Sequence, residues 1–166
     1  ESDRGLRATF LFTTSPYSSG WVGTLYDASG MLNIQQALNL GHDIESHSLG
    51  HFPDFDDSSF GSGTETAANY MPRYSSDLSQ TVGMSAIGEL GVSRWLLESD
   101  FSITVEGFRS GYLLIPENFL EGLRQTGYRR DSTYAAGLTR GYFPFVLFEV
   151  NSGVVTTYPI VEYPMG

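Results

Sequence analysis

Short hydrophobic runs alternate with polar and glycine-rich stretches along the 166-residue chain, and this pattern predicts strands and helices in alternation. The apolar run LRATFLF, residues 6–12, is typical of a buried strand. Residues 13–23 are rich in Ser, Thr, Gly and Pro and predict a loop. Three later runs also predict strands: HDIES at 42–46, SITVEGF at 102–108 and YRRDS at 128–132. Two more strands, over 143–150 and 153–164, are expected on either side of the turn sequence NSG.

Helical spacing of hydrophobic residues is present at three places between these runs. MLNIQQALNLG, residues 31–41, predicts a short helix with Gly41 as its C-terminal cap. Its shared face is expected to contain Leu32, Ala37 and Leu40. A longer helix is predicted from Asp77, capped by Ser75 or Ser76, with one side formed by Leu78, Val82, Ala86, Leu90 and Leu97. IPENFLEGLRQTGY, residues 115–128, predicts a third helix with Pro116 near its first turn and Gly127 just past its end.

This order of elements predicts an α/β fold in a single domain over residues 1–166. The length is sufficient for one buried core, and there is no internal repeat or interdomain linker. Residues 52–74 are rich in Asp, Ser, Gly and Thr, which predicts a long surface loop near a site. No apolar run approaches the roughly 18–20 residues that a membrane span needs.

Charge and composition narrow the classes of function. Nine Lys and Arg against nineteen Asp and Glu give a net charge of −10, which argues against a nucleic-acid partner but not against uncharged sugars. The absence of cysteine excludes disulfides and thiolate metal ligands. Aromatic residues, at 14%, suit sugar faces and are equally ordinary core material. Because Glu1 begins no secretion signal, we expect a processed product or a piece of a longer protein.

All three histidines lie in HDIESHSLGH, residues 42–51. His47 and His51 are four positions apart, so on a helical turn both imidazoles would project to one side and could reach one metal ion. Zinc suits such ligands, with a carboxylate or another histidine as a third. Ser48 stands where the HExxH motif of zinc proteases has its glutamate base, which excludes that chemistry. His42, at a helix end, is expected to be structural and to interact with the last carbonyls.

The flanking sequences bear on whether these histidines are metal ligands or only surface and cap-forming residues. LRATFLFTT, a helix and GHDIESHSLGH follow one another, and GFRSGYLLIPENFLEGLRQTGYRRDST comes further along. This arrangement resembles the central portion of the polysaccharide deacetylases of the NodB-homology family, carbohydrate esterase family 4, over most of residues 5–135. The first segment matches at Gly41, His42, Ile44, His47, Ser48 and His51. The second matches at Arg109, Tyr112, Pro116, Gly127, Tyr128, Asp131 and Ser132.

The resemblance implies a distorted (β/α) barrel without its first strand–helix unit and its last motifs. It implies that His47 and His51 bind a divalent metal, with zinc expected, and that Arg109 holds the carboxylate of a catalytic base. The backbone N–H of Tyr112 would stabilise the oxyanion. Arg109 could equally form a structural ion pair, and the Tyr112 side chain could equally fill the core. RSGY replaces the family's commoner Arg-x-Pro-aromatic sequence, which leaves this loop's geometry open.

Two family motifs are not found in the 166 residues. The base and the third metal ligand come, in the family, from a TFDDG-like strand end that would precede residue 1, and the acid comes from a late histidine, whereas no histidine follows His51. DFDD at residues 54–57 is similar in letters, but it follows the histidines and is expected to be a solvated acidic loop. It also lacks the ligand spacing of a calcium-binding loop.

Two functional hypotheses follow. The first is a metal-dependent hydrolase that removes acetyl groups from an N- or O-acetylated polysaccharide, exported or held at the cell surface as the family commonly is. The second is a non-catalytic carbohydrate-binding or structural relative with a degenerate site.

Overall fold

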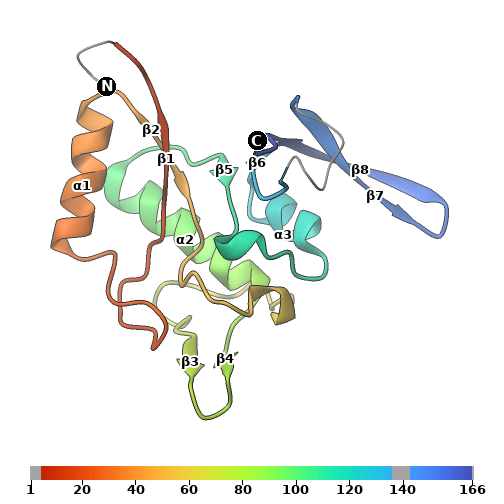
Figure 1. The fold of residues 1–166 in the computed structure, drawn as a ribbon, viewed down its shortest axis with the longest axis horizontal. Helices are drawn as coiled ribbons and strands as arrows, with labels where there is room; N and C mark the ends of the chain where they lie inside the picture. The colour runs from red at the N-terminus through yellow and green to blue at the C-terminus, as the bar shows by residue number, and fades with distance from the viewer. Residues whose placement is uncertain (1–4, 136–142, 166) are drawn as a thin grey trace.

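A mostly parallel β-sheet is the main feature of the computed structural model, which describes residues 5–135 and 143–165 (Figure 1). Its strand order among these residues is β1-β2-β5-β6-β8-β7. The strands are β1 (Thr9–Phe12), β2 (Asp43–Ser46), β5 (Gly107–Phe108), β6 (Arg130–Asp131), β7 (Phe145–Asn151) and β8 (Val154–Glu162). β1, β2, β5, β6 and β8 pair in parallel, whereas β7 runs antiparallel to β8. Among the described residues no pairing joins β1 to β7, so these two strands are the edges of the sheet.

In the described residues, three α-helices lie between the parallel strands: α1 (Ala28–Asn39), α2 (Ala86–Phe101) and α3 (Phe119–Gln125). Parallel neighbours need such crossover connections, and this alternation confirms the α/β class predicted from the sequence. The late hairpin is also confirmed, because β7 and β8 meet at Ser152 and Gly153, both with positive φ. In Figure 1 this hairpin extends away from α3.

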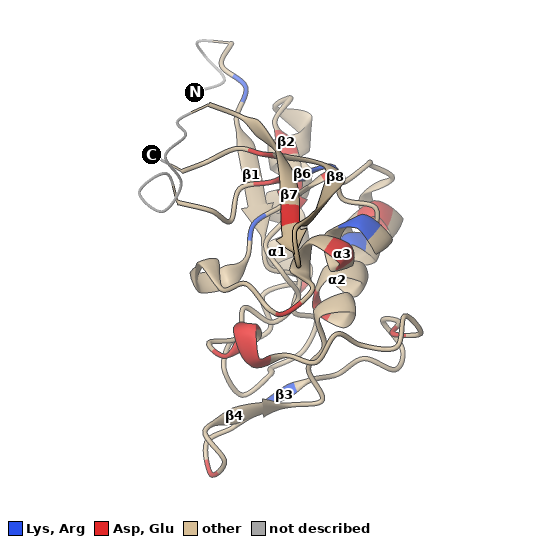
Figure 2. Cartoon of the chain, turned by 90° about the vertical axis from the view of Figure 1, so that its right-hand side faces the viewer, with Lys and Arg blue, Asp and Glu red and all other residues tan. Residues whose placement is uncertain are grey.

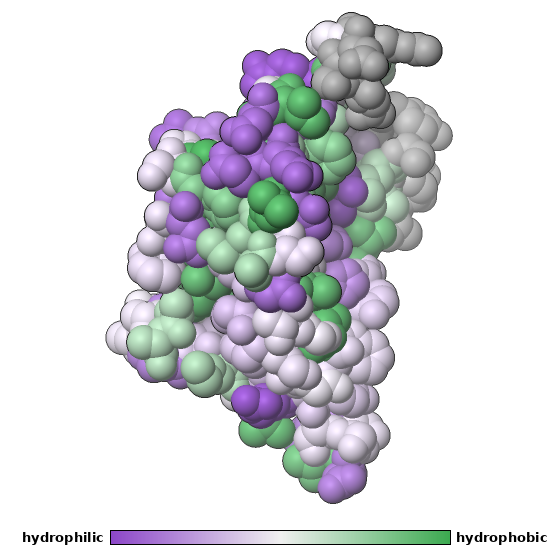
Figure 3. Space-filling view, turned by 90° about the vertical axis from the view of Figure 1, so that its left-hand side faces the viewer, coloured by the Kyte–Doolittle hydropathy of each residue, from purple (hydrophilic) through white to green (hydrophobic). Residues whose placement is uncertain are grey.

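The C-terminal end of α1 lies where the sequence predicted it, but the prediction of which residues form its buried face was wrong. The Asp27 carboxylate accepts the N–H groups of Ser29 and Gly30, and Gly41, at φ +80°, follows the last turn as expected. Leu32 and Leu40 are more than half exposed, and Ile34 is the buried residue. On the α1 side of the molecule such hydrophobic groups lie scattered among polar ones (Figure 3), which is ordinary for a protein surface.

The predicted start of the second helix was also wrong. Its expected first two turns, from Asp77, instead form the turn and the second strand of an antiparallel hairpin of β3 (Arg73–Ser75) and β4 (Gln80–Val82). Leu78 and Val82 are more than half exposed, and α2 begins only after Ser85, whose side chain accepts the Gly88 N–H.

A contact from outside the helix pattern explains this difference. Asp54 accepts both the backbone N–H and the hydroxyl of Thr81, at 2.5 and 2.6 Å, and so holds β4 extended. Gly83, at φ +78°, then turns the chain toward α2. Asp54 is therefore a structural residue rather than part of a solvated loop. Asp56 and Asp57, in the 3-10 turn η2 (Phe55–Asp57), are exposed as expected. Figure 2 shows acidic positions in separate parts of the chain, α3 among them.

The core lies between α2, α3 and one face of the sheet. Phe108 of β5 contacts the rings of Phe119 and Tyr128, with centroids 5.9 and 5.4 Å apart. On β2 the Ser46 hydroxyl bonds to that of Ser93 on α2, at 2.7 Å. Because strand side chains alternate between faces, Glu45 and Arg109 lie on the other face. In the described residues no helix is long and apolar enough to cross a membrane.

Leu90→Ala is expected to lower the free energy of unfolding by about 2–5 kcal/mol, because Leu90 is fully buried on α2 and its loss leaves a cavity. Leu78→Ala is the control, since Leu78 is 61% exposed and its truncation should change stability by no more than about 0.5 kcal/mol. Urea unfolding measures both. Equal losses in the two variants would contradict the placement of α2.

Candidate metal-binding site

His47 and His51 lie beside each other at the carboxyl end of β2, with ring centroids 4.8 Å apart. β2 lies between β1 and β5, and the His47 N–H bonds to the Phe12 carbonyl at 2.9 Å, which continues the parallel pairing by one residue. The carboxyl ends of parallel strands are the usual location of binding sites in α/β proteins. The sheet therefore brings both imidazoles to an edge where a site is expected.

The two histidines are joined by a tight loop rather than the predicted helical turn. Ser48 and His51 have φ angles of 67° and 50°, in the left-handed region, which a right-handed helix excludes. The Ser48 hydroxyl accepts the His51 N–H at 3.0 Å, and the Ser48 carbonyl accepts the Thr14 N–H at 3.2 Å. The spacing of four residues thus brings the rings together, although by a different backbone path.

The hydrogen bonds of His47 fix which ring nitrogen is available. Its Nδ1 lies 2.8 Å from the Arg109 carbonyl oxygen, which can only accept, so Nδ1 carries the hydrogen and Nε2 keeps a free lone pair. Burial lowers the pKa of His47, helped by the nearby His51, while the bond to the Arg109 carbonyl opposes this. Burial also lowers the pKa of His51. Neutral imidazoles are the form that binds metals, so the pair suits a cation.

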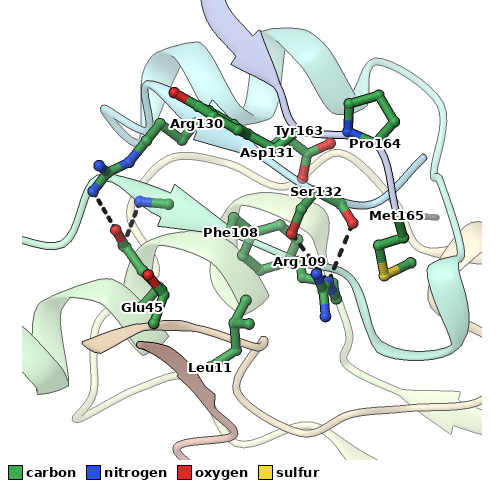
Figure 4. A pocket seen from close by; sticks show the side chains of 12 residues that line it. Leu11, Glu45, Phe108, Arg109, Arg130, Asp131, Ser132, Tyr163, Pro164 and Met165 are labelled. Atoms are coloured by element: carbon green, nitrogen blue, oxygen red, sulfur yellow. Dashed lines mark hydrogen bonds and ion pairs between the residues drawn. The ribbon is translucent and has the colours of Figure 1, made fainter. Parts of the chain in front are cut away.

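Arg109 directly follows β5, and its side chain faces a cavity of about 430 Å³ (Figure 4). Its Nε donates to the Ser132 hydroxyl at 3.0 Å and to the Ser132 carbonyl at 3.2 Å. Elsewhere in the cavity, Glu45 accepts from Arg130 and from the Gly107 N–H. Burial raises the pKa of Glu45, and these two donors oppose that rise. Among the described residues, the Arg109 side chain is therefore oriented by Ser132, the residue after β6, and has no acidic partner in an ion pair.

Tyr112 lies over His51 on the 3-10 turn η3 (Gly111–Leu113). The two ring centroids are 4.6 Å apart, and Tyr112 has a φ of 53°. Its side chain is 55% exposed, so it does not fill the core. An exposed aromatic ring on a strained backbone beside a histidine pair is a feature found at binding sites. The structure thus places the rings of His47, His51 and Tyr112 beside one another and the Arg109 carbonyl against His47, and the catalytic and metal-binding roles of these residues stay predictions.

A buried carboxyl pair lies next to this region. Asp131 and Glu162 are register partners on β6 and β8, and both are at most 1% exposed. Thr133 donates its hydroxyl to Asp131 Oδ1 at 2.7 Å, and the Tyr134 N–H donates to Glu162 Oε1 at 3.1 Å. The remaining oxygens, Oδ2 and Oε2, have no hydrogen-bond partner within the described part of the chain. Burial and mutual repulsion raise the pKa of Glu162, and burial raises that of Asp131.

Sequence reasoning missed Glu162 and also Glu89, which bonds to the histidine loop at Gly50. Each is a single acidic residue inside an apolar run, AIGELGV or PIVEYP, and that interruption was the available signal. His42 lies apart from the pair, and its Nδ1 accepts the Ala8 N–H at 3.2 Å. Its role is structural, but its ring bonds the start of β1 instead of the helix carbonyls.

Residues 5–135 and 143–165 contain no group of three or more His, Cys, Asp or Glu side chains arranged to hold a metal ion. His47 and His51 fit two positions of a zinc site, because their nitrogens are neutral donors and one is oriented by a backbone carbonyl. A third protein ligand is not found in this part of the chain.

Comparisons with known proteins support the fold. No family model matches the chain, and no curated protein matches it. Among solved structures it is similar to the crystal structure of a candidate polysaccharide deacetylase from Mycobacterium smegmatis, with a TM-score of 0.60 and 17% identity. The match covers 99% of this chain and 42% of that one. The chain thus has a deacetylase-like α/β fold and spans less than half the length of that structure.

Proposed function

We propose that the protein is a metal-dependent hydrolase that removes acetyl groups from an acetylated polysaccharide, with His47 and His51 as metal ligands. The observation that carries this proposal is the imidazole pair, with its centroids 4.8 Å apart at the carboxyl edge of the sheet. The deacetylase-like fold supports it. Zinc is the proposed metal, because two neutral nitrogen donors suit it, and it would supply Lewis-acid activation of water and of the acetyl carbonyl.

The roles of the remaining residues follow from their contacts. The Arg109 carbonyl orients His47 so that Nε2 is presented to the metal. The Arg109 guanidinium, anchored by Ser132, would hold a base carboxylate and the negative charge that develops during hydrolysis. Tyr112, exposed above His51, would line the sugar-binding surface, and its backbone N–H would support the oxyanion. Location outside the cell or at its surface stays a prediction from the resemblance.

One observation favours the alternative of a non-catalytic carbohydrate-binding relative. The described residues supply two metal ligands but no third carboxylate or histidine beside them. A site of this kind could hold a glycan without hydrolysing it. The two functions differ in whether acetate is released.

The expected result of a zinc-binding experiment is one bound zinc ion per chain, with binding lost in His47→Ala and in His51→Ala. The physical reason is that each substitution removes one of two paired nitrogen donors. Equilibrium dialysis followed by metal analysis measures the stoichiometry. His42→Ala is the matched control, because it removes the only other histidine, whose ring bonds to Ala8.

The outcomes separate the hypotheses. Zinc retained in His47→Ala, or lost equally in His42→Ala, would remove the metal site and with it the proposed activity. Acetate release from an N-acetylated chitooligosaccharide by the zinc-loaded protein supports the hydrolase. Zinc binding and glycan binding without acetate release would instead support the non-catalytic alternative.

A further inference from the structure

Glu89, on the first turns of α2, is a fully buried carboxyl group at the back of the histidine loop. It is 1% exposed, and its Oε2 accepts the Gly50 N–H at 2.8 Å. Its Oε1 accepts the Tyr70 hydroxyl at 3.2 Å. Burying a carboxyl group is unfavourable unless hydrogen bonds compensate, so its partners are the groups that make this position tolerable. One of those partners, the Gly50 N–H, belongs to the residue directly before His51.

The loop that Glu89 contacts is strained and needs support from outside. Ser48 and His51, neither of them glycine, both have left-handed backbone angles, and such residues persist only where their surroundings hold them. The Ser48 hydroxyl supports the loop from inside by accepting the His51 N–H. On another side, a Cβ at Gly50 would lie 2.0 Å from the Phe52 ring, so the backbone is closely packed there. Glu89 supplies the third constraint.

Glu89 is itself held in place. The Tyr70 hydroxyl shares its one hydrogen between Glu89 Oε1, at 3.2 Å, and the Ser85 carbonyl, at 3.0 Å. It also accepts the Ser85 N–H at 3.0 Å, and Ser85 caps α2. A Cβ at Gly88 would lie 2.2 Å from the Tyr70 ring, so the tyrosine packs directly on the helix. The carboxylate is thus fixed to α2 from one side and to the loop from the other.

We propose that Glu89 is a positioning residue for the His47–His51 pair. By accepting the Gly50 N–H, its carboxylate holds the loop in the conformation in which the two imidazoles face each other. This inference rests on the proposed function, in which His47 and His51 are metal ligands. The relative position of the two rings, however, can be measured without metal. Glu89 acts through the loop backbone and touches neither ring nor substrate.

The test compares Glu89→Leu and Glu89→Gln in the full chain without metal. In Glu89→Leu we expect the nuclear Overhauser contacts between the rings of His47 and His51, and between His51 and Tyr112, to disappear, because the Gly50 N–H loses its acceptor. The Phe108–Tyr128 contact in the core should persist and reports folding. Glutamine keeps an acceptor oxygen, so Glu89→Gln should rescue the ring contacts.

Glu98→Leu is the matched control. Glu98 lies on the same helix and also accepts a backbone N–H from a neighbouring segment, that of Val105 at 3.0 Å. Its removal should leave the histidine ring contacts unchanged even if it lowers stability. Loss of these contacts in Glu98→Leu as well would show a merely structural effect and would overturn the proposal, as would their persistence in a folded Glu89→Leu variant.

A second measurement keeps the proposal testable if Glu89→Leu does not fold. In the unaltered protein the Gly50 amide should exchange slowly with solvent. At about pH 8 or above, where Glu89 with its pKa of about 7 is mostly ionised, the Gly50 proton resonance should lie further upfield in Glu89→Gln, because a charged acceptor is replaced by a neutral one. A fast-exchanging Gly50 amide, or an unmoved resonance, would contradict the proposal.

Cobalt(II) titration then connects the loop to metal binding. Affinity should fall about 10–100-fold in Glu89→Leu and remain near the original in Glu98→Leu. If the unaltered protein does not bind cobalt or zinc, the proposed function fails, whereas the ring contacts still decide the role of Glu89. Unchanged cobalt affinity in Glu89→Leu would overturn the positioning role.

Discussion

Raising the pH from mildly acidic to alkaline is expected to destabilise the protein strongly, because of the Asp131–Glu162 pair. Both carboxyl groups are buried, and their pKa values in the folded protein are raised above those of the unfolded chain. The folded state therefore keeps protons that the unfolded state releases. This contribution to stability is fully present below the unfolded pKa values, about 4, and is lost as pH rises through the raised folded values.

The expected loss of folding stability with rising pH is considerable. Each pH unit over which the folded state holds one extra proton removes about 1.4 kcal/mol of stability. Chemical unfolding followed between about pH 5 and about pH 9 measures the slope. Burial also raises the pKa of Glu89, to about 7, so Glu89 adds to the same trend, and a variant is needed to assign the slope.

Glu162→Gln is that variant. Its amide can still accept the Tyr134 N–H and can donate to the Asp131 Oδ2 that has no partner, so the fold should be retained. Stability should then depend much less on pH, and at alkaline pH the variant should be more stable than the original. Glu149→Gln, on the exposed part of the same hairpin, should leave the slope unaltered. An equal slope in Glu162→Gln and the original protein would mean that Glu162 does not keep a proton in the folded state over this pH range.

The order of strands and helices could be predicted from the sequence because it depends on local signals. Hydrophobic runs, the turn at Ser152–Gly153 and the glycine after α1 each act over a few residues, and each was found where expected. The β3–β4 hairpin could not be predicted, because the Asp54–Thr81 bonds join residues 27 positions apart. Leu78 and Val82 happen to have helical spacing, and a long-range contact overrides it.

The candidate site was predictable to a similar extent. The spacing of His47 and His51 indicated that the two rings could meet, and the resemblance added Arg109 and Tyr112, whereas the roles of all four stay predictions. The contacts that hold these residues were not recognisable. Ser132 was matched through the resemblance, but its bond to Arg109, like that of Glu89 to the Gly50 N–H, joins segments brought together only by folding. A sequence pattern identifies donors for a metal more readily than the residues that hold those donors in place.

Gly111→Ala is expected to impair metal binding with little loss of fold stability. Gly111 lies on η3 against His51, and an added Cβ would be 2.9 Å from His51 Cδ2 and 3.2 Å from its Nε2. The His51 ring would have to move, yet Tyr112 lies at 4.6 Å on another side and His47 at 4.8 Å. Zinc affinity should therefore fall about 10–100-fold, as for other disturbances around metal ligands.

The backbone at Gly111 does not have a positive φ, so alanine can adopt its conformation, and the effect of the substitution should be confined to the ring. Gly23→Ala is the control, because nothing lies within 4 Å of a Cβ there. Zinc titration, thermal unfolding and the His51 imidazole resonances, measured on both variants, separate binding from folding. If Gly111→Ala bound zinc as tightly as Gly23→Ala and left the His51 resonances unmoved, His51 would not occupy the position on which its role as a ligand depends.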